Sequence, residues 1–276
     1  RRVLFRSDLM LNGEYKGIYQ LGEKVKISKK RVNVGDDGIL MEIDARATSE
    51  DDARYFNITH IPNPVNIKDP DVEYDDELFN YAKDYLTQTD DVLFSENFTD
   101  PDEGWQKYMD MDSFVDWYLV NEISKNNDAV FLSSCYMNLK QGGKLKMGPL
   151  WDYDLAFGGY LTELWGREHV NETNGFYIKT GVVWYNRLFQ DPVFVSRVKE
   201  RFNCYYTNRQ QIYDHIDAKA ATIKEKIYED NKMWGTICDK SATEDEVKET
   251  YQEKVDYLKN WIKERLVWLY ENINAL

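Results

Sequence analysis

The spacing of apolar residues changes along the chain, and this change constrains the fold more than any other feature of the sequence. Near the start, Leu9–Leu11 and Tyr15–Leu21 flank Asn12-Gly13, a dipeptide typical of two-residue hairpin turns. The run Ile39–Asp44 predicts a further strand, which carries two acids. From about residue 75 the apolar residues instead recur every three or four positions, as on one face of a helix. We therefore predict an α+β protein with a small β-rich N-terminal part and a mainly helical remainder.

The helical part shows several start signals and apolar stripes. Asp75–Glu77 suit the first turn of one helix, Asp112 suits the N-cap of a second, and Pro192 is well placed to open a third. Beyond Pro192 we expect helix to the end, interrupted by a loop over Asn231–Gly235. The stripes assigned to the core are Leu78, Tyr81, Ala82, Tyr85 and Leu86; Phe114, Val115, Tyr118, Leu119 and Ile123; Phe194, Val198 and Phe202; Ile212 and Ile216; Ile223 and Ile227; and Val247, Tyr251, Val255, Leu258, Ile262, Leu266, Leu269 and Ile273.

The segment from Ala45 to Val72 shows neither spacing and contains Pro62, Pro64 and Pro70. We expect it to be an irregular linker or flap, because clustered prolines interrupt regular elements. It would divide the chain into a β-rich partial N-terminal lobe, residues 1–72, and a helical C-terminal lobe, residues 73–276.

Composition excludes several classes of function. The net charge of −14 argues against nucleic acid or an anionic membrane surface as the main partner. No apolar run approaches the roughly 20 residues of a membrane span. The three cysteines and three histidines show no metal-ligand spacing, so a zinc site and a histidine-based triad have little support, and we expect buried free thiols.

Two carboxylates mark the most distinctive stretch, Gly148–Gly159. Asp152 and Asp154 are two residues apart, and in an extended segment residues i and i+2 point to the same side. Carboxylates so close repel each other unless a cation lies between them or one is protonated. Mg²⁺ held by carboxylates and phosphate oxygens is the usual form in phosphotransferases. Asp-x-Asp pairs also occur without a metal, but the aromatic residues around this pair favour a partly dry site and hence a cation.

A third acid, Asp128, lies where the second predicted helix ends. The stretch Asn121–Asp128 contains three Asn and one Asp, which suit such termini because their side chains bond to nearby backbone groups. We expect a hairpin of Cys135–Lys140 and Lys144–Met147 to follow and to lead to Asp152. A loop acid, a hairpin and a second acid follow one another in kinase-like folds, where the first acid is the base and the second binds metal.

Several motifs resemble the spore-coat CotH kinase family, in the same order and over essentially the whole chain. The stretch Leu11–Lys24 resembles the family signature LNGEYxGxYxLxEK. The other similar stretches are Asn126–Asp128, Gly143–Pro149, Trp151–Gly158, Trp184–Pro192, Trp261–Arg265 and Trp268-Leu269.

The resemblance implies an atypical protein-kinase-like fold and ATP-dependent phosphorylation of serines on a protein acceptor. Carried over to this chain, Asp128 would be the catalytic carboxylate beside the acceptor hydroxyl. Asp152 would hold Mg²⁺, with Asp154 as a second or supporting ligand. Glu23 and Lys24, at the end of the signature, are the residues we assign to ATP binding. The resemblance is also compatible with an extracytoplasmic or surface-associated bacterial protein.

Two departures from the family pattern bear on activity. Many members have an Asn five residues after the loop Asp, where it could help to bind metal, and this chain has Ser133 there. Members also carry roughly a hundred residues ahead of the hairpin, including the lysine expected to hold the ATP phosphates. The chain would then be N-terminally truncated relative to the family, because Lys24 and Lys26 are poor replacements for that lysine.

Two other functions stay open at this point. A non-catalytic, pseudokinase-like module for binding or surface assembly would keep the helical core and lack turnover, and Ser133 favours it. Carbohydrate chemistry also uses paired carboxylates. However, Asp152 and Asp154 come from one segment, which favours shared cation binding over flanking a sugar from two sides.

Overall fold

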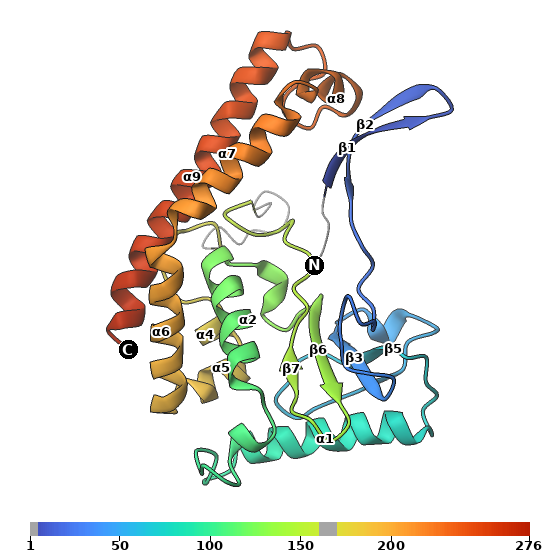
Figure 1. Ribbon diagram of the computed structural model, residues 1–276, viewed down its shortest axis with the longest axis vertical. Helices are drawn as coiled ribbons and strands as arrows, with labels where there is room; N and C mark the ends of the chain where they lie inside the picture. The colour runs from blue at the N-terminus through green and yellow to red at the C-terminus, as the bar shows by residue number, and fades with distance from the viewer. Residues whose placement is uncertain (1–4, 160–169) are drawn as a thin grey trace. The chain divides into compact units, whose positions relative to one another are not determined.

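The computed structural model describes residues 5–159 and 170–276, and these form two compact units. One unit combines the chain up to Lys24 with Cys204–Glu264, and the other combines Val25–Asn203 with Arg265–Leu276. Small sheets come early in the chain and helices dominate its later part, so the architecture is α+β, as predicted (Figure 1). The lobe boundary expected near residue 72 stays a prediction. No helix within the described ranges is both long and apolar enough to span a bilayer.

The larger unit is built on an antiparallel five-stranded sheet with the order β4-β5-β3-β6-β7. The central strand pairs on both sides, with Met41 opposite Ile67 of one neighbour and Met137 of the other. The strands are β3 (Gly38–Ile43), β4 (Tyr55–Phe56), β5 (Val65–Asp69), β6 (Cys135–Lys140) and β7 (Lys146–Met147).

The two faces of β3 pack against different residues, because side chains alternate along a strand. Ile39, Met41 and Ile43 share one face and are fully buried. Leu40 lies on the other face, in a cluster with Val32, Val34 and Tyr136, and Trp151 packs against this cluster. Trp151 directly precedes Asp152. The cluster therefore fixes the start of residues 151–159, the acidic loop, to the sheet.

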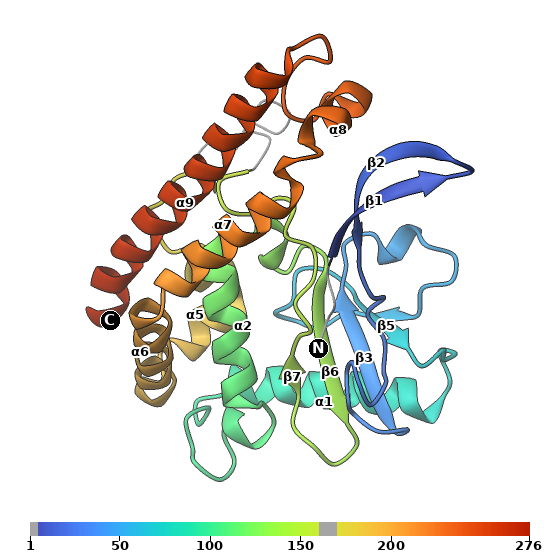
Figure 2. The same cartoon turned by 45° about the horizontal axis from the view of Figure 1, so that its top comes forward.

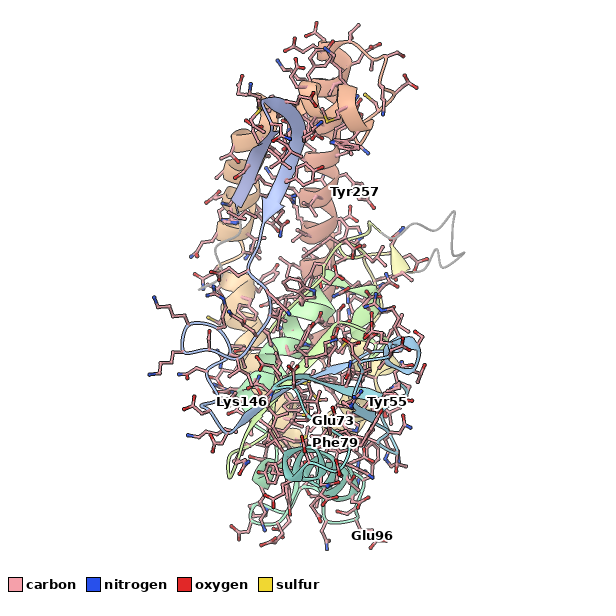
Figure 3. The ribbon with its side chains drawn as sticks, turned by 90° about the vertical axis from the view of Figure 1, so that its right-hand side faces the viewer. Tyr55, Glu73, Phe79, Glu96, Lys146 and Tyr257 are labelled. Carbon is pink, nitrogen blue, oxygen red and sulfur yellow. The ribbon has the colours of Figure 1, made fainter. Side chains whose placement is uncertain are left out.

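Helices complete the larger unit. Figure 1 and Figure 2 show α1 lying crosswise to β3 and β6. Phe79 of α1 is on the side of the helix toward the sheet (Figure 3), and its ring meets Phe56 edge-on at 5.6 Å. The helices are α1 (Glu77–Leu93), α2 (Met111–Ser124), α4 (Ile178–Gly181) and α5 (Val183–Leu188), with single 3-10 turns at Ala47–Ser49, Trp105–Lys107 and Asn127–Ala129.

The smaller unit contains the predicted hairpin and the helices around it. They are β1 (Phe5–Leu11), β2 (Glu14–Leu21), α7 (Gln210–Lys224) and α8 (Ile227–Trp234), while α6 (Pro192–Thr207) and α9 (Glu244–Asn274) contribute residues to both units. Asn12 (φ 52°) and Gly13 (φ 84°) both have the left-handed backbone that a type I′ hairpin turn requires. The hairpin signal in the sequence is therefore confirmed.

The structure also explains a glycine of the hairpin signature. Gly17 has φ +106°, and a Cβ added there would lie 2.5 Å from Nε1 of Trp234. That nitrogen donates a hydrogen bond to the Lys16 carbonyl at 3.0 Å, and the Ile18 amide donates to Asp230 at 2.7 Å. Two side chains of α8 thus cap the outer edge of β2, which is possible because Gly17 has no side chain.

Several expectations need correction. The segment Ala45–Val72 is not an irregular linker throughout, because it contains β4 and β5, and Val65 and Asn66 of β5 are buried beside β3. The second helix is capped by Asp110, whose side chain accepts from the Ser113 amide at 2.9 Å, and Asp112 instead lies inside its first turn.

The loop expected over Asn231–Gly235 is also wrong for its first four residues. Asn231–Trp234 are helical and close α8, and Gly235 (φ 67°) ends it. Asn231 is fully buried, and its side-chain oxygen accepts hydrogen bonds from the Ile237 and Cys238 amides. This polar residue therefore organises the turn after the helix while still belonging to it.

The helical stripes match the core only in part, because Leu258 of α9 and the α7 residues Ile212, Ile216 and Ile223 are half-buried and α7 has no buried residue. Val247, Tyr251, Val255, Ile262, Leu266, Leu269 and Ile273 of α9 are all buried, as the spacing predicts. On α1 the buried face includes Phe79, which the predicted stripe omits. The three cysteines carry free thiols, but only Cys135 is buried, whereas Cys204 is exposed and Cys238 is half-buried.

Candidate active site

Three carboxylates that are far apart in sequence meet in the larger unit. Asp128, Asp152 and Asp154 each present a carboxylate oxygen, and these oxygens lie within 4.8 Å of one another. Asp128 is half-buried, and the other two are exposed. The structure therefore brings together the three acids to which the sequence assigned catalysis and metal binding.

The two aspartates of the acidic loop reach this point by a route that the sequence did not indicate. The expected extended segment is wrong, because β7 ends at Met147 and residues 151–153 belong to no strand. Asp152 has φ 57°, in the left-handed region, and a turn begins at Asp154. The carboxylates converge because the backbone bends, and not because of strand alternation. The hairpin that leads to them, β6 and β7, is as predicted.

Backbone strain is concentrated around these loops. Six non-glycine residues in the described ranges have a left-handed φ, and five of them lie in the site loops: Lys125, Phe131, Ser134, Asp152 and Phe157. Residues other than Gly rarely adopt this backbone conformation, and each such residue destabilises the fold by on the order of 1 kcal/mol or more. Such residues persist where the surrounding contacts fix them, and they cluster at functional sites.

Asparagine side chains lock the loop of Asp128 to the loop of Asp152. Asn126 donates from Nδ2 to the Asp152 carbonyl at 3.0 Å, and Asn127 donates in the same way to the Leu155 carbonyl at 3.1 Å. The Phe157 amide donates to the Ser124 carbonyl at 2.7 Å. Because Asn126 and Asn127 are both buried, water does not compete for their side-chain hydrogen bonds. The spacing of the carboxylates is therefore fixed by direct bonds between the two loops.

A buried ion pair anchors the end of α2, directly before the Asp128 loop. Glu122 and Arg265 are both fully buried, and Nη2 of Arg265 lies 2.7 Å from Oε1 of Glu122. Glu122 also accepts hydrogen bonds from the amides of Tyr177, Ile178 and Lys179, at the start of α4. This network joins α2, α4 and α9 around the base of the site.

The carboxylates of the cluster disfavour one another's charge. Burial raises the pKa of Asp128, and the neighbouring Asp152 and Asp154 raise it further. Burial and then Asp154 also raise the pKa of Asp152, whereas a hydrogen bond with Ser134 lowers it. Anions that remain this close without a partner gain stability when a cation joins them.

The cluster suits a hard divalent cation. Mg²⁺ prefers carboxylate oxygens at about 2.0–2.1 Å in octahedral geometry, which spaces adjacent ligand atoms by about 2.9 Å and opposite ones by about 4.1 Å. The observed separations, up to 4.8 Å, are close enough for small side-chain rotations to meet this requirement. Asp128 lies near enough to the other two to serve as a ligand as well as a base.

Two further residues at the site were missed by the sequence reasoning. Ser134 is buried and its side chain forms a hydrogen bond with Asp152. The neighbouring Ser133, which the family pattern singles out, instead donates from its backbone amide to the Asp128 carbonyl at 3.5 Å. Arg46 lies close enough to lower the pKa of both Asp128 and Asp152. The only sequence signal for Arg46 is its position two residues after Asp44, the acidic end of the predicted strand.

Glu23 and Lys24 follow β2 and belong to the smaller unit, whereas the acidic cluster belongs to the larger one. Glu23 is half-buried and Lys24 is exposed. Their assignment to ATP binding stays a prediction.

Comparison with known proteins agrees with the motifs. A family model described as CotH kinase protein matches residues 6–269, which is nearly the whole chain. No curated protein shows significant similarity to the chain.

Proposed function

Because the chain belongs to the CotH kinase family, we propose that it transfers the γ-phosphoryl group of ATP to serine hydroxyls of a protein acceptor. A kinase-like function in general follows from the family, and the acceptor, the nucleotide and turnover by this chain are parts of the proposal. The observation that carries it is the convergence of Asp128, Asp152 and Asp154 from two loops that are bonded to each other.

Each carboxylate has a role in the proposal. Asp152 and Asp154, exposed on the acidic loop, hold Mg²⁺, which neutralises charge on the phosphates when it is bound. Asp128 accepts the proton of the serine hydroxyl. Burial, the largest cause of its raised pKa, makes it a better proton acceptor than a fully exposed aspartate. The asparagine bonds between the loops keep these groups in position, which is the main requirement for phosphoryl transfer.

The test is transfer of labelled phosphate from γ-labelled ATP to a serine-rich acceptor protein, with Mg²⁺. Asp128→Asn and Asp152→Asn should each reduce transfer by at least about a hundredfold, the scale expected for loss of a base or a metal ligand. The matched control is Glu96→Gln, which removes an exposed carboxylate of the same unit after α1 and should leave transfer unchanged. Equal transfer in Asp152→Asn and Glu96→Gln would refute the proposal.

The second candidate is a non-catalytic binding module, favoured by Ser133 in place of the expected Asn. The same experiment separates the two when binding is measured beside transfer. A chain that binds Mg²⁺ and ATP through Asp152, yet transfers no phosphate to any hydroxyl acceptor or to water, fits the second candidate and not the first.

A further inference from the structure

The segment that follows β3 is bonded directly to the loop that carries Asp128. The Ala45 amide donates a hydrogen bond to the Leu132 carbonyl at 2.9 Å. The Leu132 amide in turn donates to the Asp128 carbonyl at 3.0 Å. Two consecutive backbone hydrogen bonds thus connect Ala45, the residue before Arg46, to Asp128.

Asp44 binds the guanidinium of Arg46 through its Nε atom. Its Oδ1 accepts from the Arg46 amide at 3.0 Å and from Nε at 3.2 Å, and Asp44 itself is only 1% exposed. The side chain of Arg46 is 67% exposed. Among the residues that the structure describes, none accepts a hydrogen bond from its Nη atoms. The guanidinium is therefore oriented by a buried carboxylate while its outer donors remain available.

The charges around the cluster distinguish Arg46 from other cations. Its guanidinium acts on both Asp128 and Asp152, lowering the pKa of each, against the opposing influence of burial and the neighbouring acids. Lys68, on β5, lies instead 3.6 Å from Glu42 and 4.0 Å from Glu50, and it is not among the main charges that act on Asp128 or Asp152. Arg46 pairs through Nε with Asp44 and not with the three carboxylates, so its Nη donors suit an anionic ligand that binds beside the acidic cluster together with a cation.

We propose that Arg46 contacts the phosphates of the nucleotide, donating hydrogen bonds from its Nη atoms to oxygens of the transferred phosphoryl group. This inference rests on the proposed function, because it assumes a triphosphate at the acidic cluster. A guanidinium offers a planar fork of donors that matches phosphate oxygens, and arginines in this role stabilise the charge of phosphoryl transfer. No covalent step involves Arg46.

The test compares two probes whose affinities should change in opposite directions. In Arg46→Met, Mn²⁺ alone should bind about two- to fivefold more tightly, because an exposed positive charge no longer repels it. Mn²⁺ with ATP should bind roughly tenfold or more weakly, because a charged hydrogen bond to phosphate is lost. Arg46→Lys should restore only part of this affinity, since an ammonium lacks the fork.

The matched control is Arg54→Met. Arg54 also pairs with a carboxylate through Nε, at 2.8 Å from Glu73, and it is not among the main charges that act on Asp128 or Asp152. This variant should leave both affinities unchanged.

The outcomes separate the inference from the proposed function. If Arg46→Met weakens both probes together, or changes neither, the assignment of Arg46 is wrong while the acidic site stands. If the unmodified protein binds neither probe, both the proposed function and the role of Arg46 are overturned. A weaker transfer rate without any loss of nucleotide affinity would also contradict a direct phosphate contact in the bound state.

Discussion

Replacing Arg265 with methionine should destabilise the fold by leaving a charged Glu122 buried without its partner. Arg265 is fully buried, and it donates to the Glu122 carboxylate and carbonyl and to the carbonyls of Thr173 and Gly175. Removing one member of a buried ion pair typically costs about 3–5 kcal/mol. We expect the lower half of this range, because three backbone amides still donate to Glu122.

The assay is urea unfolding followed by circular dichroism, with the unfolding free energy obtained from the midpoint and slope. The decisive comparison is Arg265→Met against the double variant Glu122→Gln with Arg265→Met. Neutralising the orphaned carboxylate should recover on the order of 1 kcal/mol or more, so the double variant should be the more stable. A single variant that loses less than about 1 kcal/mol, or a double variant no better than the single one, would refute the electrostatic reasoning.

Three further predictions concern the loops, the hairpin and pH. Asn126→Ala removes the bond to the Asp152 carbonyl, and it should weaken Mn²⁺ binding several-fold with a stability loss of about 1–2 kcal/mol, as measured by titration and urea unfolding. Gly17→Ala should lower the melting temperature, with an unfolding free energy about 1–3 kcal/mol smaller, because its methyl group would meet Trp234 and its φ is left-handed; an unchanged melting temperature would contradict the capping of β2. The raised pKa values of Asp128 and Asp152 mean that the folded state binds protons more readily than the unfolded chain, so their contribution destabilises the metal-free fold as pH rises through the raised pKa values. Asp152→Asn should therefore raise the melting temperature of the metal-free protein at pH 7 and give no such gain near pH 3, where this carboxylate is protonated in both states. A lower melting temperature at pH 7 would count against repulsion within the cluster.

Local signals in the sequence are sufficient to predict the elements whose conformation depends on nearby residues. Asn12-Gly13 specifies its turn because both residues tolerate a positive φ. The stripe from Val247 to Ile273 identifies a helix because burial repeats with the helical period. The acids of the site were also recognisable, because carboxylates two residues apart require a physical explanation wherever they lie.

Elements that depend on distant partners could not be predicted in the same way. Strand β5 has five residues, and its place beside β3 is set by non-local pairing and not by any period within Val65–Asp69. The bend at Asp152 arises from the loops that Asn126 and Asn127 bond together, and a left-handed aspartate leaves no pattern in the sequence. Arg46 reaches the site through the hydrogen bond of Ala45 to Leu132, about 90 residues away in the chain.

The central claim is that Asp152 and Asp154 bind a divalent cation with a triphosphate, and that Asp128 lies beside this site as the base. Anomalous diffraction from crystals grown with Mn²⁺ and a non-hydrolysable ATP analogue tests this claim directly. We predict a Mn²⁺ peak within coordination distance of Asp152 and Asp154, with the terminal phosphate beside it and Asp128 facing the open side of that phosphate. A map with no peak among these carboxylates, or with the metal and nucleotide bound elsewhere, would contradict the account.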